Sequence, residues 1–301
     1  MISELSTIEK IHEMDVSIII ISYNTRTLLK QCIKSVFEKT EDIIFEVIVV
    51  DNASADGSQQ MIRGEFPNVK LIENIENIGF GQANNLGAKS AAGKYLLLLN
   101  SDTVLLNNAV KILFDFITKN ANVAICGGNL FDENKKPAHS YSKLPCIMQE
   151  LKRLLLIPNL NSFNYTDKPQ KTGYITGADL MIRADIFNRL NGFDSDFFMY
   201  YEESELTCRV KREGYDVYSV PQAEIMHLEK KSFSDNERRL GMIFKSCKTY
   251  YKKTHGKLYR IIVNSIILMI IISRLMAFSL LFNKKKINCW KSILKIYINK
   301  S

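Results

Sequence analysis

Several features that would assign the chain to a protein class are missing or scarce. Its 301 residues include six cysteines without a CxxC pair, and only four histidines, six prolines and one tryptophan. Several of the cysteines stand inside apolar runs, where a free thiol behaves as a small buried hydrophobe. The six are Cys32, Cys126, Cys146, Cys208, Cys247 and Cys289. This scatter argues against a disulfide framework or a zinc site and indicates a reducing compartment.

Two further signals are absent. Residues 1–15 alternate charged and apolar side chains and lack the apolar core of a signal peptide, so we expect the folded part to stay in the cytosol. Despite a formal net charge of +8, the basic residues are not interleaved with aromatics in one stretch, so we expect no nucleic-acid partner. They concentrate late, at 252–260 and 284–286, which favours an anionic membrane surface; a solvated basic tail is the alternative.

What the sequence does contain is an alternation of apolar strands and amphipathic helices, in a chain that is 46% hydrophobic and 24% charged. Continuous apolar runs indicate strands buried on both faces. The expected strands are 16–21, 47–50, 69–72 and 95–99, and the expected helices are 28–37, 82–91 and 110–117. The alternation predicts an α/β fold with a Rossmann-like, mostly parallel sheet flanked by helices.

Three of these strands end in polar clusters. In an open α/β sheet, ligands bind beyond the carboxyl ends of the strands. A single cluster can be a helix cap, as we expect of Asp56 before Gly57. Three clusters at one sheet edge predict a ligand site instead. They are Ser22-Tyr23-Asn24, Asp51-Asn52 and Asn100-Ser101-Asp102.

The second half of the chain is less regular. Residues 131–171 hold four of the six prolines and little periodicity, so we expect a flexible segment outside the core that faces an acceptor. Order returns over 173–182. An acidic cluster at 202–205 begins a helix that runs through Arg212, and a strand is expected at 215–220.

The C-terminal part is apolar over 261–273 and again over 275–282. Together these runs exceed the roughly 20 residues of a spanning helix, but Arg274 in the bilayer costs about 2.5–3.5 kcal/mol on insertion scales. We therefore expect one or two helices lying in the membrane interface, with Lys284–Lys286 at the head groups. A hydrophobic helix docked on the rest of the chain or on a second subunit is the alternative. The chain then divides into a domain at 1–256 and a helical extension at 257–301.

Taken in order, these motifs resemble the inverting glycosyltransferases of family 2, which have a GT-A fold, and most closely their bacterial rhamnosyltransferase-like branch. The resemblance runs from Val16 to about His255. Each piece is weak alone, and together they are specific. The pieces are 17–24, 49–58, 74–81, 98–103, Gly192-Phe193-Asp194, 200–209, and His227 with Ser232 downstream.

The resemblance implies a divalent cation, Mg²⁺ or Mn²⁺, which neutralises the diphosphate of a sugar donor as a Lewis acid. Asp102 matches the second acid of the DxD-like metal motif, while Asn100 stands at the first and has lost its charge. His227 matches a histidine that supplies an additional metal ligand, although a lone histidine is more often structural.

The resemblance also assigns the donor site. Asp51 matches the acid that accepts a hydrogen bond from the pyrimidine N–H of a uridine or thymidine donor; a turn role is its alternative. Tyr23, next to Asn24 at the sheet edge, can stack on the base; closing the sheet edge is its alternative. Asn77 and Gly79 match the loop that borders the donor, where glycine permits close approach of backbone.

Inverting transfer needs a general base for the acceptor hydroxyl. The acidic cluster aligns with a Glu-Asp-x-Asp motif, so Glu203 occupies the base position, which is normally Asp. Glu205 replaces the second Asp, so both acids are one methylene longer than in the motif. Either the site has been rebuilt around the longer side chains, or it is less constrained and the enzyme is weak or inactive. An acidic run on a solvated helix face is the alternative.

The resemblance thus predicts an inverting transferase that moves a sugar, rhamnose in the nearest branch, from a dTDP- or UDP-linked donor to a cell-surface glycan or lipid-linked acceptor. We expect it in the cytoplasm, peripherally bound to the inner face of the cell membrane. A nucleotidyltransferase is one alternative, although it would carry a Gly-rich basic loop where 22–25 stands. A non-catalytic member of a glycan assembly complex is the other, kept open by Glu203.

Overall fold

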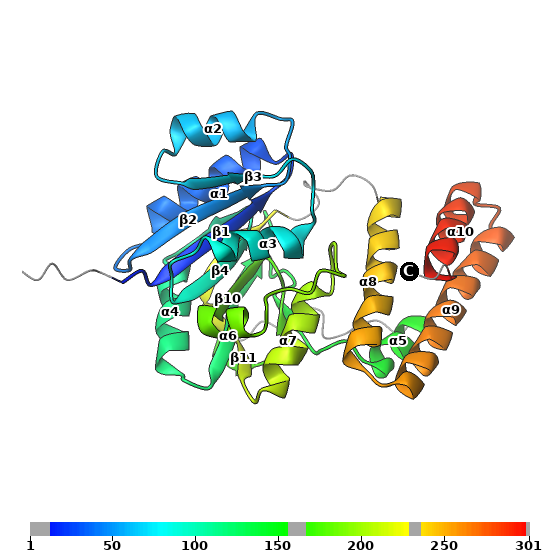
Figure 1. The fold of residues 1–301 in the computed structure, drawn as a ribbon. Helices are drawn as coiled ribbons and strands as arrows, with labels where there is room; N and C mark the ends of the chain where they lie inside the picture. The colour runs from blue at the N-terminus through cyan, green and yellow to red at the C-terminus, as the bar shows by residue number, and fades with distance from the viewer. Residues whose placement is uncertain (1–12, 156–166, 229–235, 299–301) are drawn as a thin grey trace, which may run out of the picture.

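The computed structural model describes residues 13–155, 167–228 and 236–298. Ser232, quoted above with the motifs, lies outside the described residues. Figure 1 shows two parts: a sheet covered by helices, and a group of helices formed by α5 and the C-terminal elements. The site depends on how these two parts meet.

Among the described residues, the main sheet has nine strands in the order β3-β2-β1-β4-β10-β6-β11-β5, with β8 beside β11. β1 pairs in parallel with β2 and β4, and β2 with β3, which confirms the four strands expected from the sequence. β10 is antiparallel to β4 and β6, and β5 and β8 are antiparallel to β11. The strands are β1 (Val16–Ser22), β2 (Phe45–Asp51), β3 (Lys70–Glu73), β4 (Tyr95–Asn100), β5 (Thr103–Leu105), β6 (Val123–Phe131), β8 (Gln170–Lys171), β10 (Asp179–Arg183) and β11 (Asp216–His227).

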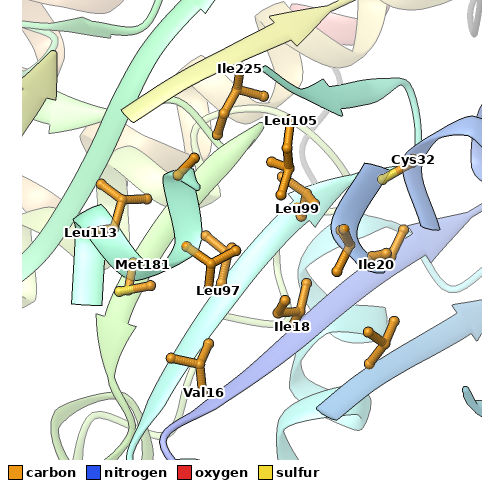
Figure 2. Packing of buried hydrophobic residues seen from close by; sticks show 14 of the residues in the cluster. Val16, Ile18, Ile20, Cys32, Leu97, Leu99, Leu105, Leu113, Met181 and Ile225 are labelled. Atoms are coloured by element: carbon orange, nitrogen blue, oxygen red, sulfur yellow. The ribbon is translucent and has the colours of Figure 1, made fainter. Parts of the chain in front are cut away.

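Helices cover both faces because successive strand residues point to opposite sides. Ile18 and Ile20 of β1 pack with α1, α2 and α4, as Figure 2 shows for the cluster around them. Ile19, between them, packs on the other face with α3, α6 and α7. The helices are α1 (Arg26–Lys39), α2 (Ser58–Glu65), α3 (Phe80–Lys89), α4 (Ala109–Lys119), α6 (Ala184–Arg189) and α7 (Glu202–Arg212).

Two strands differ from expectation. Sequence reasoning missed β6, whose apolar run is interrupted by Gly127 and Gly128. The strand expected at 215–220 continues to His227 as a single β11. Pro221, which has no N–H for the ladder, falls where the pairing of β11 with β6 shifts register between Ser219 and Glu224. Because β11 continues past Pro221, His227 lies within the strand, opposite Thr103 of β5.

The segment expected to lie outside the core is partly built into it. It contributes α5 (Ile147–Leu154), and β7 (Tyr141–Ser142) pairs with β9 (Tyr174–Ile175). α5 packs against α9, and Glu150 of α5 is buried, accepting a hydrogen bond from Tyr251 Oη at 3.3 Å. The expectation was wrong for 141–154 because α5 finds a packing partner more than 100 residues away. The rest of the segment, 156–166, lies outside the described residues.

The C-terminal helices are α8 (Asn236–Thr254), α9 (Lys257–Leu280) and α10 (Lys284–Ile298), and they share one apolar cluster with Ile147 of α5. α9 is long and apolar enough to cross a membrane by length and composition. One face of α9 is buried in the group of helices. Its other face exposes large apolar side chains, namely Leu258, Ile261, Ile262, Met269, Ile272, Met276 and Leu280.

Candidate active site

A cavity of about 400 Å³ lies beyond the carboxyl ends of β1 and β4. The polar clusters at the strand ends meet there, as expected: Thr25 Oγ1 donates to Ser101 Oγ at 2.9 Å, and Asn52 N donates to the Ser22 carbonyl at 2.8 Å. We call this cavity the donor cavity, after the sugar donor that the resemblance implies. Five of the site residues singled out from the sequence line it, namely Tyr23, Asn77, Asp102, Glu203 and His227. The other three, Asn24, Asp51 and Gly79, are not in its lining.

Asp102 and His227 form the polar centre of the donor cavity. Asp102 stands between β4 and β5, and the antiparallel pairing of β5 with β11 brings His227 opposite Thr103. His227 Nε2 lies 3.2 Å from Asp102 Oδ1 and 3.5 Å from Asn100 Nδ2. Both side chains are buried. A carboxylate oxygen and an imidazole nitrogen thus converge from two strands.

This pair fits a divalent cation that is shared with a substrate. Within the described residues, no group of three or more His, Cys, Asp or Glu side chains could hold a metal ion alone. Mg²⁺ is commonly bound through one or two carboxylates together with substrate phosphates and water. Asp102 and His227 therefore suit a metal whose remaining ligands come from a donor diphosphate.

Asp179, at the start of β10, is a buried acid that sequence reasoning missed. Burial raises the pKa of this carboxyl to about 7, against the opposing effects of the Gly128 hydrogen bond and the nearby His227. Asp179 Oδ2 accepts the Gly128 N–H at 2.5 Å. A single acid at the head of an apolar strand was the only signal in the sequence.

Asp51 and Asn24 organise the loops beside the cavity. Asp51 Oδ2 accepts from Ser54 N at 2.8 Å and from Gln59 Nε2 at 2.7 Å, so it fills the turn role. Its Oδ1 is buried without a hydrogen-bond partner, which leaves an acceptor unsatisfied. Asn24 has a positive φ of 54°, and its Oδ1 accepts from Ala55 N at 2.8 Å. Asn24 therefore ties the first loop to the second.

Gly79 is required by the approach of another segment of the chain. Its φ is +85°, and a Cβ there would lie 2.3 Å from the Phe198 carbonyl oxygen. The next residue, Phe80, donates its N–H to that oxygen at 2.9 Å. Asn77 Oδ1 accepts from Gly79 N at 3.0 Å and holds the turn. The loop thus fixes the segment that leads into α7, and Asn77 and Phe80 face the donor cavity.

The acids at the start of α7 have different surroundings. Tyr200 and Tyr201 both have positive φ, an uncommon turn that places the helix start at the donor cavity. Burial raises the pKa of Glu203 to about 7, although hydrogen bonds from its own backbone and from Ser204 act in the opposite direction. Burial and the charge of Glu203 raise the pKa of Glu202 well above its usual value. The acidic run is therefore not a solvated helix face.

Glu205 has a structural role. Its carboxylate pairs with Arg209 at 2.6 Å. Arg209 also donates to the carbonyls of Leu190 and Gly192, at 2.7 Å and 2.8 Å. Glu205 is buried and does not line the donor cavity. Of this acidic cluster, only Glu202 and Glu203 line the donor cavity.

Two curated relatives resemble this chain in sequence. The N-acetylglucosaminyl-diphospho-decaprenol L-rhamnosyltransferase of Mycobacterium tuberculosis is 24% identical over 230 residues, covering 70% of this chain and 75% of the relative. Rhamnosyltransferase WbbL of Escherichia coli is 25% identical over 230 residues, covering 70% of this chain and 83% of the relative.

Among solved structures, the mannosyltransferase PcManGT from Pyrobaculum calidifontis, in complex with GDP-Man and Mn²⁺, matches with a TM-score of 0.58 and 16% identity. The match covers 96% of this chain and 86% of that one, and it shows a GT-A-like fold. The model of glycosyl transferase family 2 matches residues 17–190, more than half of the chain. The chain therefore belongs to glycosyl transferase family 2 and is a rhamnosyltransferase-like glycosyltransferase.

Proposed function

We propose that the enzyme transfers rhamnose, with inversion, from a dTDP- or UDP-linked donor to a lipid-linked acceptor. The observation that carries the proposal is the position of Glu203: a carboxyl with a pKa of about 7 in the same cavity as the Asp102–His227 pair. The names of the two relatives support rhamnose, and that of the mycobacterial enzyme supports a lipid diphosphate acceptor.

The donor binds along the sheet edge in this proposal. Tyr23 is 48% exposed at the mouth of the cavity and offers a ring face to the base. Asp51 is fully buried outside the cavity lining, so its unsatisfied Oδ1 accepts a pyrimidine N–H only if the side chains beside it move when the base binds. Asp102 and His227 would hold Mg²⁺ or Mn²⁺, with the donor diphosphate supplying further ligands. When bound, the cation supplies Lewis-acid stabilisation of the leaving nucleoside diphosphate.

Glu203 performs the proton transfer. Its carboxylate takes the proton of the acceptor hydroxyl as that oxygen attacks the anomeric carbon. The bond from this carbon to the diphosphate oxygen breaks on the opposite face, which inverts the configuration. A base works best when its pKa lies near the operating pH, and burial supplies that match for Glu203.

The pH dependence of kcat/KM tests this role. Only the ionised form of Glu203 accepts a proton, so activity should rise with pH up to about 7, the pKa of Glu203, and level off above it. Below that pKa, each pH unit should cost about tenfold in rate. The measurement is the initial rate of nucleoside diphosphate release between pH 5 and 9. A rate that stays constant from pH 5 to 7 would exclude a base with this pKa.

We also propose that α9 docks the enzyme on the inner face of the cell membrane, from the cytoplasm. Met269, Ile272 and Met276 are each about half exposed or more on its outer face. Lys284, Lys285 and Lys286 follow immediately, at the start of α10, where they suit anionic head groups.

Point changes test membrane docking better than truncation does. Removing α9 and α10 would uncover the cluster that they share with α8. Replacing Met269, Ile272 and Met276 together by Gln should shift the enzyme from the bound to the free fraction in flotation with anionic phospholipid vesicles. Ile75→Gln changes an exposed side chain far from α9 and serves as the control. Equal binding of the triple variant and the wild type would refute α9 as the docking face.

A further inference from the structure

A second cavity, of about 580 Å³, adjoins the donor cavity. The two share Glu203, Tyr174 and Arg239 in their linings. From Glu203 the second cavity extends away from Asp102 and His227 toward α5 and the segment before it. In Figure 1, α5 lies beside α8 and α9, at the foot of the C-terminal helices. Asp102 and His227 line only the first cavity, so a molecule in the second cavity would reach Glu203 from a different part of the site.

The second cavity is rich in cations, and we call it the basic cavity. Its lining carries four Lys and Arg side chains, namely Lys143, Lys152, Arg153 and Arg239. Its acids are Glu150 and Glu203. Burial raises the pKa of both carboxyls, and Glu150 is already engaged by Tyr251. The positive charge of the basic cavity therefore exceeds the negative charge that faces it.

The two arginines of the basic cavity stack on aromatic rings, and its two lysines are exposed and can bind a ligand. Arg153 lies 4.7 Å from the ring centre of Phe244, and Arg239 lies 5.9 Å from that of Tyr200. Arg153 also forms an ion pair with Glu150, in which Nη1 lies 3.7 Å from Oε2. The guanidinium atoms that these contacts do not use can still donate hydrogen bonds. Lys143 and Lys152 are exposed, and among the described residues neither forms an ion pair with a carboxylate. Clustered Lys and Arg side chains are the groups that bind phosphate oxygens in proteins.

We propose that the basic cavity binds the diphosphate of a lipid-linked acceptor and that the acceptor sugar extends from there to Glu203. This inference rests on the proposed function. The donor diphosphate belongs at the other end of the site, beside Asp102 and His227. α5, which carries Lys152 and Arg153, packs directly against α9, whose outer face is apolar. The same group of helices thus carries both the basic cavity and an exposed apolar face that suits a lipid chain.

Calorimetry tests the inference with geranyl diphosphate, inorganic pyrophosphate and geraniol as probes, each titrated at low salt. Saturating UDP, and in a second series dTDP, keeps the donor cavity occupied. The test variant is Lys143→Gln with Lys152→Gln, because both side chains are exposed and leave the core untouched. The control is Lys89→Gln with Lys119→Gln, which removes the same charge at two exposed positions outside both cavities.

We expect geranyl diphosphate to bind the wild type and the control, and to bind the test variant at least about tenfold more weakly, since two charge-assisted contacts are lost. Geraniol should not bind measurably. Equal affinity of the test variant for geranyl diphosphate would overturn the inference. Pyrophosphate binding as tightly as geranyl diphosphate would overturn the assignment to a lipid-linked acceptor. In both outcomes the test variant should bind UDP and dTDP as the wild type does. This control separates a failure of the acceptor inference from a failure of the proposed donor site.

Discussion

Replacing Glu203 by Gln should lower turnover by roughly 10²–10⁴-fold, the usual contribution of a positioned general base. The amide keeps the size and hydrogen bonding of the side chain but cannot accept the proton. Donor affinity should stay nearly unchanged, because in the proposed mechanism Glu203 contacts the acceptor. The measurement pairs the steady-state release of nucleoside diphosphate with calorimetric binding of the nucleotide.

Two further variants sharpen the result. Glu41→Gln makes the same change at an exposed position far from the site and should keep wild-type turnover. Glu203→Asp shortens the reach by one methylene and should also cost activity if the buried surroundings of α7 are built for Glu. Wild-type turnover in Glu203→Gln would show that Glu203 is not the base. Glu202 would then be the next acid to test, since Glu205 is held by Arg209.

Replacing Asp102 by Ala should remove the part of donor affinity that depends on Mn²⁺ and depress kcat/KM by roughly 100-fold or more, because a metal at a leaving diphosphate is worth several kcal/mol. The fold should survive, since Asp102 belongs to none of the three apolar clusters. Calorimetric titration of UDP and dTDP, with and without Mn²⁺, measures the effect.

Asp115→Ala provides the matched control, because Asp115 pairs with Lys111 on α4, away from the donor cavity. His227→Ala removes the second proposed ligand and should weaken the Mn²⁺-dependent part of binding as well. If Asp102→Ala binds the nucleotide as tightly as the wild type in Mn²⁺, the proposed metal site is wrong.

The parallel half of the fold and the location of the site could be predicted from sequence. Continuous apolar runs such as 16–21 and 95–99 identify strands buried on both faces, because few other structures require them. The polar residues that follow those strands then lie at one edge by topology alone. This is why Tyr23 and Asp102 lie in the same cavity. Glu203 begins α7 and follows none of these strands, so only the resemblance pointed to it.

Long-range packing could not be predicted in the same way. β6 was missed because its glycines break the apolar pattern, and α5 was missed because its partner α9 is distant in sequence. Asn24 and Gly79 were assigned to the donor, yet their contacts are with Ala55 and Phe198. A motif gives the type of residue at a position, whereas the choice between ligand and loop contact depends on the neighbouring segments.

The most direct test of the account is turnover of nucleotide sugars by the wild-type enzyme with Mn²⁺. dTDP-rhamnose, UDP-hexoses and GDP-mannose would each be incubated with a lipid diphosphate acceptor that carries one sugar. The account predicts release of nucleoside diphosphate from dTDP- or UDP-linked sugars, matched mole for mole by acceptor that gains one sugar with inverted anomeric configuration. Release of pyrophosphate, or no transfer from any of these donors, would contradict it.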